Sequence, residues 1–110
     1  MEDRERRIGL NEAVFREVNE RIREIGQTMQ ATVEQLDLVC ECGMADCTQR
    51  IRMTHAEYEA LRSNGRHFAV VPGHEINDVE TIVDRRDGYD VVEKEPGETA
   101  QLAEETDPRS

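Results

Sequence analysis

The three cysteines of the chain lie within eight residues, in the stretch VCECGMADC that begins at Val39. In an extended segment, residues i and i+2 point to the same side, so Cys40 and Cys42 can face one point while Glu41 faces away. Cys47 returns after a loop that contains a glycine. Three thiolates that converge on one volume repel one another unless a cation neutralises them, and Zn²⁺ is the usual cation with sulfur ligands. The C-x-C-x4-C spacing therefore predicts a zinc site.

A tetrahedral zinc site needs a fourth ligand, and three histidines compete for that position. His74 follows a Pro-Gly turn, which lets the chain double back at the end of a strand and present an imidazole beside a neighbouring hairpin tip. His55 is expected in the first turn of a helix and His67 in a strand, where each has a simpler structural role. Asp46 or a water molecule is an alternative fourth ligand. We predict a Cys3His site made of Cys40, Cys42, Cys47 and His74.

A closed Cys3His shell leaves no position for water or substrate, so the zinc would be structural. The chain has no G-x-S-x-G motif, and HEIND lacks the second histidine of H-E-x-x-H. We therefore predict a non-enzymatic zinc-binding interaction or regulatory protein with no catalytic residues. In one alternative the cysteines are small buried hydrophobes without a ligand.

A second alternative is a thiol-based redox sensor or oxidoreductase, in which Cys40 or Cys42 attacks and Cys47 resolves. Glu41 and Asp46 oppose this reading, because neighbouring negative charge stabilises the thiol over the thiolate.

Composition limits the protein to a few classes. A chain of 110 residues is expected to form one domain, and with 4% aromatic residues its apolar bulk is scarce, so a metal or a partner subunit would add stability. The net charge of −11 opposes binding to nucleic acid and to anionic lipid. The sequence has no long apolar run and no apolar signal segment, and its odd cysteine count is atypical of secreted disulfide frameworks. We expect a cytoplasmic protein with no membrane partner.

Apolar residues at three-then-four spacing predict a long amphipathic helix over about residues 8–34. Its stripe of Phe15, Val18, Ile22 and Ile25 suggests an interface with a protein partner or, in a homodimer, with a second copy. The alternative is that the stripe covers the domain's own sheet, as most amphipathic helices in small domains do.

The remaining pattern predicts a zinc-knuckle-like hairpin over 36–54, a helix over 55–63 and further strands within 67–94. Thr54 and Glu57 form a capping box for the helix, and the Asp87-Gly88 pair marks a hairpin turn. The fold class is therefore α+β. A single metal-stapled domain over 1–94 combines a small antiparallel sheet with a long N-terminal helix and a short inserted helix. Residues 95–110 are rich in acids, Pro and Gly and predict a flexible acidic tail that can be deleted without loss of fold or metal.

The blocks NEAVFREVNERI, VCECGMADC, EYEALR, VVPGHE, GYDVVEK and ETDPRS together resemble a family of small uncharacterised actinobacterial proteins. The resemblance spans most of the chain. It implies an N-terminal helix, a C-x-C-x4-C cluster and a Pro-Gly-His turn, and it favours His74 over the other histidines. It implies no activity or substrate, but it does imply that the acidic tail ends in a short recognised segment.

Overall fold

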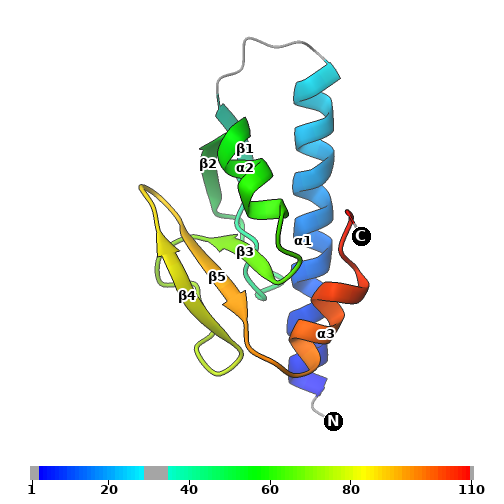
Figure 1. Ribbon diagram of the computed structural model, residues 1–110. Helices are drawn as coiled ribbons and strands as arrows, with labels where there is room; N and C mark the ends of the chain where they lie inside the picture. Colours follow the sequence, from blue (N-terminus) through cyan, green and yellow to red (C-terminus); the bar gives the residue numbers. More distant parts are fainter. Residues whose placement is uncertain (1–2, 29–34, 110) are drawn as a thin grey trace.

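The computed structural model describes residues 3–28 and 35–109, which form three helices and five strands (Figure 1). In chain order these elements are α1 (Asp3–Thr28), β1 (Gln35–Val39), β2 (Arg50–Thr54), α2 (His55–Arg62), β3 (His67–Val70), β4 (Glu80–Arg85), β5 (Asp90–Lys94) and α3 (Glu98–Glu105). The long helix α1 runs along one side of the molecule, with α3 beside its N-terminal half. The α+β class is confirmed.

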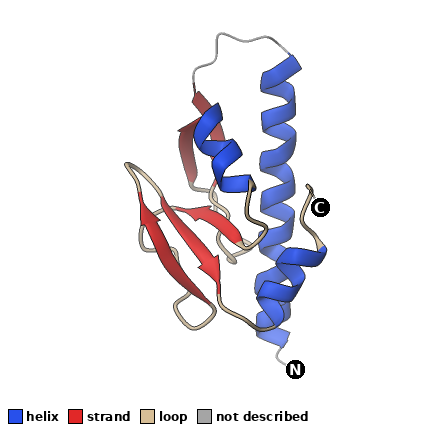
Figure 2. Ribbon diagram, in the orientation of Figure 1, coloured by secondary structure: helices blue, strands red, loops and turns tan. Residues whose placement is uncertain are grey.

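The strands form two antiparallel sheets (Figure 2), where the sequence predicted one. The first pairs β1 with β2, and the second has the order β3-β5-β4. Alternation in the β1–β2 hairpin buries Leu36, Leu38, Ile51 and Met53. The cysteine segment leaves this ladder after Val39 and bridges to the second sheet, since the Glu41 amide donates to the carbonyl of Ala69 at 2.9 Å. This crossing explains why the strands do not form one continuous sheet.

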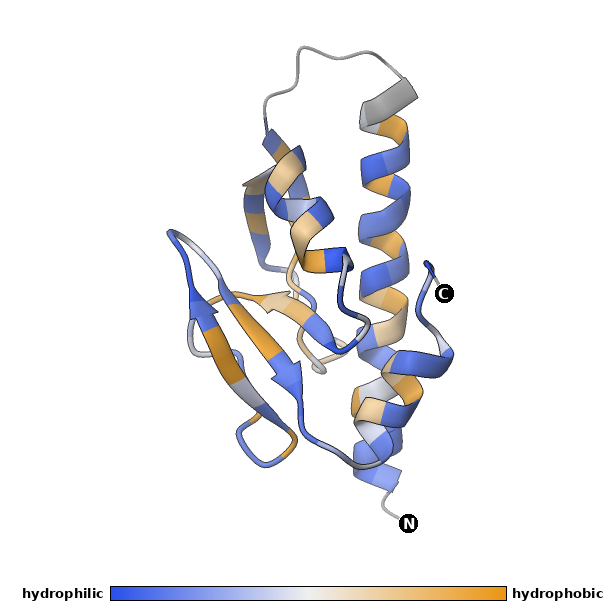
Figure 3. Ribbon diagram, viewed as in Figure 1, coloured by the Kyte–Doolittle hydropathy of each residue, from blue (hydrophilic) through white to orange (hydrophobic). Residues whose placement is uncertain are grey.

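Helix α1 begins at Asp3, five residues before the predicted start near residue 8, and its predicted end at 34 lies outside the described residues. Its first turn is polar, but Arg4 bonds Asp78 at 2.8 Å and Ile8 is buried, so tertiary contacts extend the helix. Figure 3 shows that α1 is largely hydrophilic. The side of α1 that faces the domain is polar too, with three nearly inaccessible side chains: Glu12, Arg16 and Asn19.

The predicted apolar stripe of α1 is divided between core and surface. Ile22 packs against the buried cluster of the β1–β2 hairpin, and Phe15 is half-buried. Val18 and Ile25 remain 40% and 59% exposed. Because buried polar residues occupy the side of α1 that faces the domain, part of the apolar stripe lies on the surface.

The prediction of a flexible tail over 95–110 is wrong for residues 98–105, which form α3 and pack against α1. Ala100 and Ala103 are buried in the contact. A Cβ atom on Gly9 would lie 2.6 Å from the Cδ1 atom of Leu102, so the two helices meet at this glycine. The contact uses small residues and backbone acceptors, and Arg16 donates to the carbonyl of Ala103 at 2.7 Å. Hydrophobic periodicity does not reveal such a contact.

Truncation after Glu95 is therefore expected to lower the free energy of unfolding, by about 2–4 kcal/mol, because it exposes apolar area and removes two acceptors of the buried Arg16, the carbonyl of Ala103 and the hydroxyl of Thr106. Urea unfolding of the full and shortened chains measures the difference. The variant Glu105→Gln, which changes an exposed side chain of α3, serves as the control and should lie within about 0.5 kcal/mol of the parent. If the truncated chain were as stable as the full chain, the prediction of a flexible tail would hold after all.

A buried charge cluster joins α1 to the second sheet. The Lys94 Nζ atom donates to Glu12 Oε2 at 2.7 Å and to Glu80 Oε1 at 2.6 Å, and all three side chains are almost completely inaccessible. Two carboxylates share one ammonium group here. Burial accordingly raises the pKa of Glu12 to about 8. The folded protein thus keeps a proton on Glu12 at neutral pH.

This proton makes stability depend on pH. The unfolded chain releases it near a pKa of about 4.3, whereas the folded chain holds it to about pH 8, so stability falls as pH rises between these values. The variant Glu12→Gln lacks this contribution. Urea unfolding at pH 5, 6.5, 8 and 9 should show wild type losing about 4 kcal/mol relative to Glu12→Gln, mostly before pH 8. If the free energy of unfolding changed with pH equally in the two proteins, Glu12 would be ionised in the folded protein.

Candidate metal centre

The four predicted side chains come together at one point. The Sγ atoms of Cys40, Cys42 and Cys47 and a ring nitrogen of His74 lie within 4.8 Å of one another. The His74 Nδ1 atom is 3.6 Å from the Sγ atoms of both Cys40 and Cys47. Zinc–sulfur bonds of about 2.3 Å and a zinc–nitrogen bond of about 2.1 Å give a tetrahedral S···N edge of about 3.6 Å. These two S···N distances therefore match a tetrahedral site, and none of the three cysteines forms a disulfide.

Residues on either side of the first two cysteines are held by α1, so that the cysteines themselves face the cluster. Asn19 accepts from the amide of Val39 at 2.8 Å and donates to its carbonyl at 2.9 Å. Asn11, which lies within α1, donates to the carbonyl of Gly43 at 2.9 Å. The alternation of the segment, with odd positions fixed to α1, explains how Cys40 and Cys42 share one side.

Glu41, between the two cysteines, points away from the cluster as the alternation predicts. Its carboxylate accepts two hydrogen bonds from Arg62, at 2.8 and 2.9 Å, and both side chains are buried. It also accepts from Asn19 Nδ2 at 2.7 Å and from the Ala69 amide at 3.1 Å. One carboxylate thus fixes the cysteine segment to α1, α2 and β3. Because Arg62 neutralises it, Glu41 does not oppose a thiolate as the sequence suggested.

The other two side chains of the cluster are presented by turns. The Cys47 amide donates to the carbonyl of Met44 at 3.1 Å, which closes the loop after Cys42. The His74 amide donates to the carbonyl of Val71 at 2.9 Å across the Pro-Gly pair, and the positive φ of Gly73, 94°, fits the third position of a type II turn. The Val71 amide also donates to the Sγ atom of Cys40 at 3.2 Å.

Without a bound cation, the three cysteines do not all ionise. A hydrogen bond from Cys40 lowers the pKa of Cys42 to about 5, and the same bond raises the pKa of Cys40. Burial raises the pKa of Cys47. One thiolate with two thiols is therefore the stable state of the cluster alone, since further negative charge in this volume is repelled. A divalent cation would remove that repulsion and allow all three cysteines to ionise.

The alternative ligands lie elsewhere in the described part of the chain. His67 bonds Glu93 through Nε2 at 2.9 Å, and His55 begins α2. Asp46 is exposed and does not belong to the group of four. That the group binds metal stays a prediction. Sequence reasoning missed three residues that position it, Asn11, Asn19 and Arg62, because only the fold brings them near the cysteines.

No protein-family model, curated protein or solved structure matches this chain. The relation to small actinobacterial proteins thus stays a prediction. Over residues 3–28 and 35–109, no helix combines the length and the apolar character needed to cross a membrane. The chemistry of the cluster and of the surfaces around it is then the guide to function.

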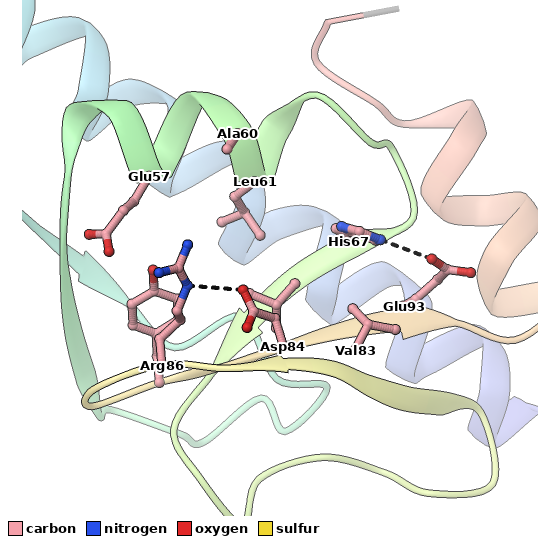
Figure 4. A pocket seen from close by; sticks show the side chains of 10 residues that line it. Glu57, Ala60, Leu61, His67, Val83, Asp84, Arg86 and Glu93 are labelled. Atoms are coloured by element: carbon pink, nitrogen blue, oxygen red, sulfur yellow. Dashed lines mark hydrogen bonds and ion pairs between the residues drawn. The ribbon is translucent and has the colours of Figure 1, made fainter.

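A hollow between α2 and the β4–β5 hairpin is a second candidate for a binding or catalytic site (Figure 4). Its charged side chains already bond neighbours: His67 with Glu93, Arg86 with Asp84 at 2.9 Å, and Glu57 with the amide of its own helix cap. The ten residues that line it include no Ser, Thr, Cys or Lys. We therefore assign it no reaction.

Proposed function

We propose that this protein is a non-enzymatic zinc-binding interaction or regulatory protein with a structural Cys3His site. The observation that carries the proposal is the convergence of Cys40, Cys42, Cys47 and His74, with the S···N spacing of a tetrahedral shell. Three soft sulfur ligands and one imidazole favour zinc over the hard cations, which prefer oxygen. Four protein ligands leave no open position, so the metal would stabilise the fold and would not activate water. Reduced thiols would suit the cytoplasm.

Elemental mass spectrometry of protein purified without chelator or added zinc tests this proposal. We expect about one zinc per chain, and its loss in His74→Ala, because three thiolates alone leave an open position and bind more weakly. The control is His67→Ala, which removes a histidine that bonds Glu93 instead. A protein without metal, or equal zinc in His74→Ala, would contradict a Cys3His site.

The interaction role is supported by the outer face of α1. Leu10, Val14, Val18 and Ile25 are each at least 40% exposed, although apolar residues are scarce in this chain. We propose that Val18 and Ile25, with the half-buried Phe15 and Ile22 beside them, contact a protein partner or a second copy. Analytical ultracentrifugation compares wild type with Val18→Asp. Self-association of wild type that the variant loses would support the homodimer, and a monomer at high concentration would exclude it.

A thiol-based redox function is the second candidate. Three free cysteines lie within 4.8 Å of one another, so two of them are close enough to be oxidised to a disulfide by a peroxide, which is reduced to water. Loss of a thiolate ligand pair would also release a bound zinc ion. Mass spectrometry after mild peroxide treatment distinguishes the candidates. A disulfide that forms and is reduced by thioredoxin favours the redox role, whereas unreacted thiols exclude it.

A further inference from the structure

A groove lies beside the metal centre, between the first turns of α1 and the loop that joins Cys42 to Cys47. Its volume is about 490 Å³, and it is lined by Arg4, Arg7, Ile8, Asn11, Gly43, Met44, Ala45 and Ile76. The loop reaches α1 at Gly43, where a Cβ atom would lie 2.6 Å from Ile8 Cγ2. Met44 is 53% exposed on the rim. This side of the groove is therefore apolar and close to solvent.

The charge of the groove is opposite to that of the protein. The chain has 25 acidic and 14 basic residues, yet the eight lining residues include two arginines and no carboxylate. Arg4 is already bonded to Asp78 through both terminal nitrogens, at 2.8 and 3.3 Å. Arg7 has no ion-pair partner among residues 3–28 and 35–109. One unpaired guanidinium thus stands next to an apolar surface, which is the pattern expected for an anion with an apolar body.

The hydrogen-bonding groups of the lining restrict this body further. The side-chain amide of Asn11 and the carbonyl of Gly43 bond each other at 2.9 Å, so this donor and this acceptor are already in use. A peptide backbone in the groove would need partners for its own amides and carbonyls, and burying such groups without a partner is unfavourable. A hydrocarbon chain has no such groups. It can cover Met44 and Ile76 and needs a polar partner only at its charged end.

We propose that this groove binds an apolar carboxylate of the fatty-acid class. The carboxylate accepts hydrogen bonds from Arg7, and the hydrocarbon chain lies against Ile8, Met44 and Ile76. This function is separate from the metal centre and goes beyond it, although the loop that forms one wall also presents Cys42 and Cys47. The ligand therefore contacts the same loop that the metal would order.

Isothermal titration of the full chain with sodium octanoate tests the proposal, with the zinc content of the same sample measured first. Octylammonium chloride is the matched probe, since it keeps the hydrocarbon chain and reverses the charge. We expect one octanoate per chain and at least tenfold weaker binding of octylammonium. Arg7→Gln should weaken octanoate at least fivefold. Arg6→Gln is the control, because Arg6 is next in sequence and does not line the groove.

Failure of octanoate to bind the wild-type protein would overturn the proposal, and so would equal binding by Arg7→Gln. Arg7 is exposed and has no ion pair to lose among the described residues, so its substitution should leave the fold intact. The measured zinc content keeps the two proposals apart. Octanoate binding to a zinc-free sample would support the groove and contradict the metal site. A zinc-loaded sample that does not bind octanoate would support the metal site and contradict the groove proposal.

Discussion

Replacing Cys42 by serine is expected to abolish the zinc binding that we propose for the cluster and to leave the protein largely unfolded at 25 °C. Cys42 is fully buried in the centre of the cluster, and a hydroxyl group does not replace a thiolate as a zinc ligand. Structural zinc sites contribute about 10–16 kcal/mol at pH 7, which is as large as the whole stability of an ordinary domain, about 5–15 kcal/mol. Because the chain has so few aromatic residues, the rest of the core cannot replace the stability that the zinc would contribute.

Circular dichroism and elemental mass spectrometry, carried out on the same samples, measure this effect. The control is Ala45→Ser, which places a hydroxyl in the same loop and removes no ligand. It should keep its zinc and unfold at the urea concentration of the parent. Adding zinc to chelator-treated wild type should raise its melting temperature in proportion to the logarithm of the zinc concentration. A zinc-free Cys42→Ser protein as stable as wild type would make the cysteines ordinary core residues.

Local patterns in the sequence predicted the elements around the cluster well. The alternation in QLDLV and RIRMT places Leu38 and Ile51 in the core, as expected of a hairpin with one buried face. The Thr54–Glu57 capping box is present with both of its hydrogen bonds, and it starts α2 one residue after β2 ends. The period of two around Glu41 also placed the neighbouring cysteines on one side. Each of these signals depends on residues that are close in sequence.

The parts that the sequence did not reveal depend on charged side chains that meet across the fold. A charged residue on a helix is normally read as solvent-facing, but Glu12 and Arg16 are buried and bond residues more than 80 positions away. The pairing of α3 with α1 uses Gly9 and alanines, which have no hydrophobic period of their own. Arg109, close to the C-terminus, likewise bonds Glu20 and Glu59. Such partners become visible only in the folded structure.

Of these buried pairs, Glu41 and Arg62 have the largest expected effect outside the proposed metal ligands. Glu41→Gln is expected to destabilise the protein by about 3–5 kcal/mol, because it leaves the guanidinium of Arg62 buried without a countercharge. The control is Asp37→Asn, which breaks an exposed pair with Arg50 at 3.5 Å and should change stability by about 0–1 kcal/mol. Urea unfolding of both variants, with zinc present throughout, gives the comparison.

The position of Glu41 between two cysteines makes its role testable beyond stability. Its carboxylate bonds α1, α2 and β3 at once, so its loss should also free the backbone that aims Cys40 and Cys42 at the cluster. We therefore expect Glu41→Gln to bind zinc at least tenfold more weakly in a competition with a chromogenic chelator, whereas Asp37→Asn binds as wild type does. If Glu41→Gln lost stability but kept full zinc affinity, the cysteine segment would be ordered by the metal alone. The buried pair would then serve the core and not the site.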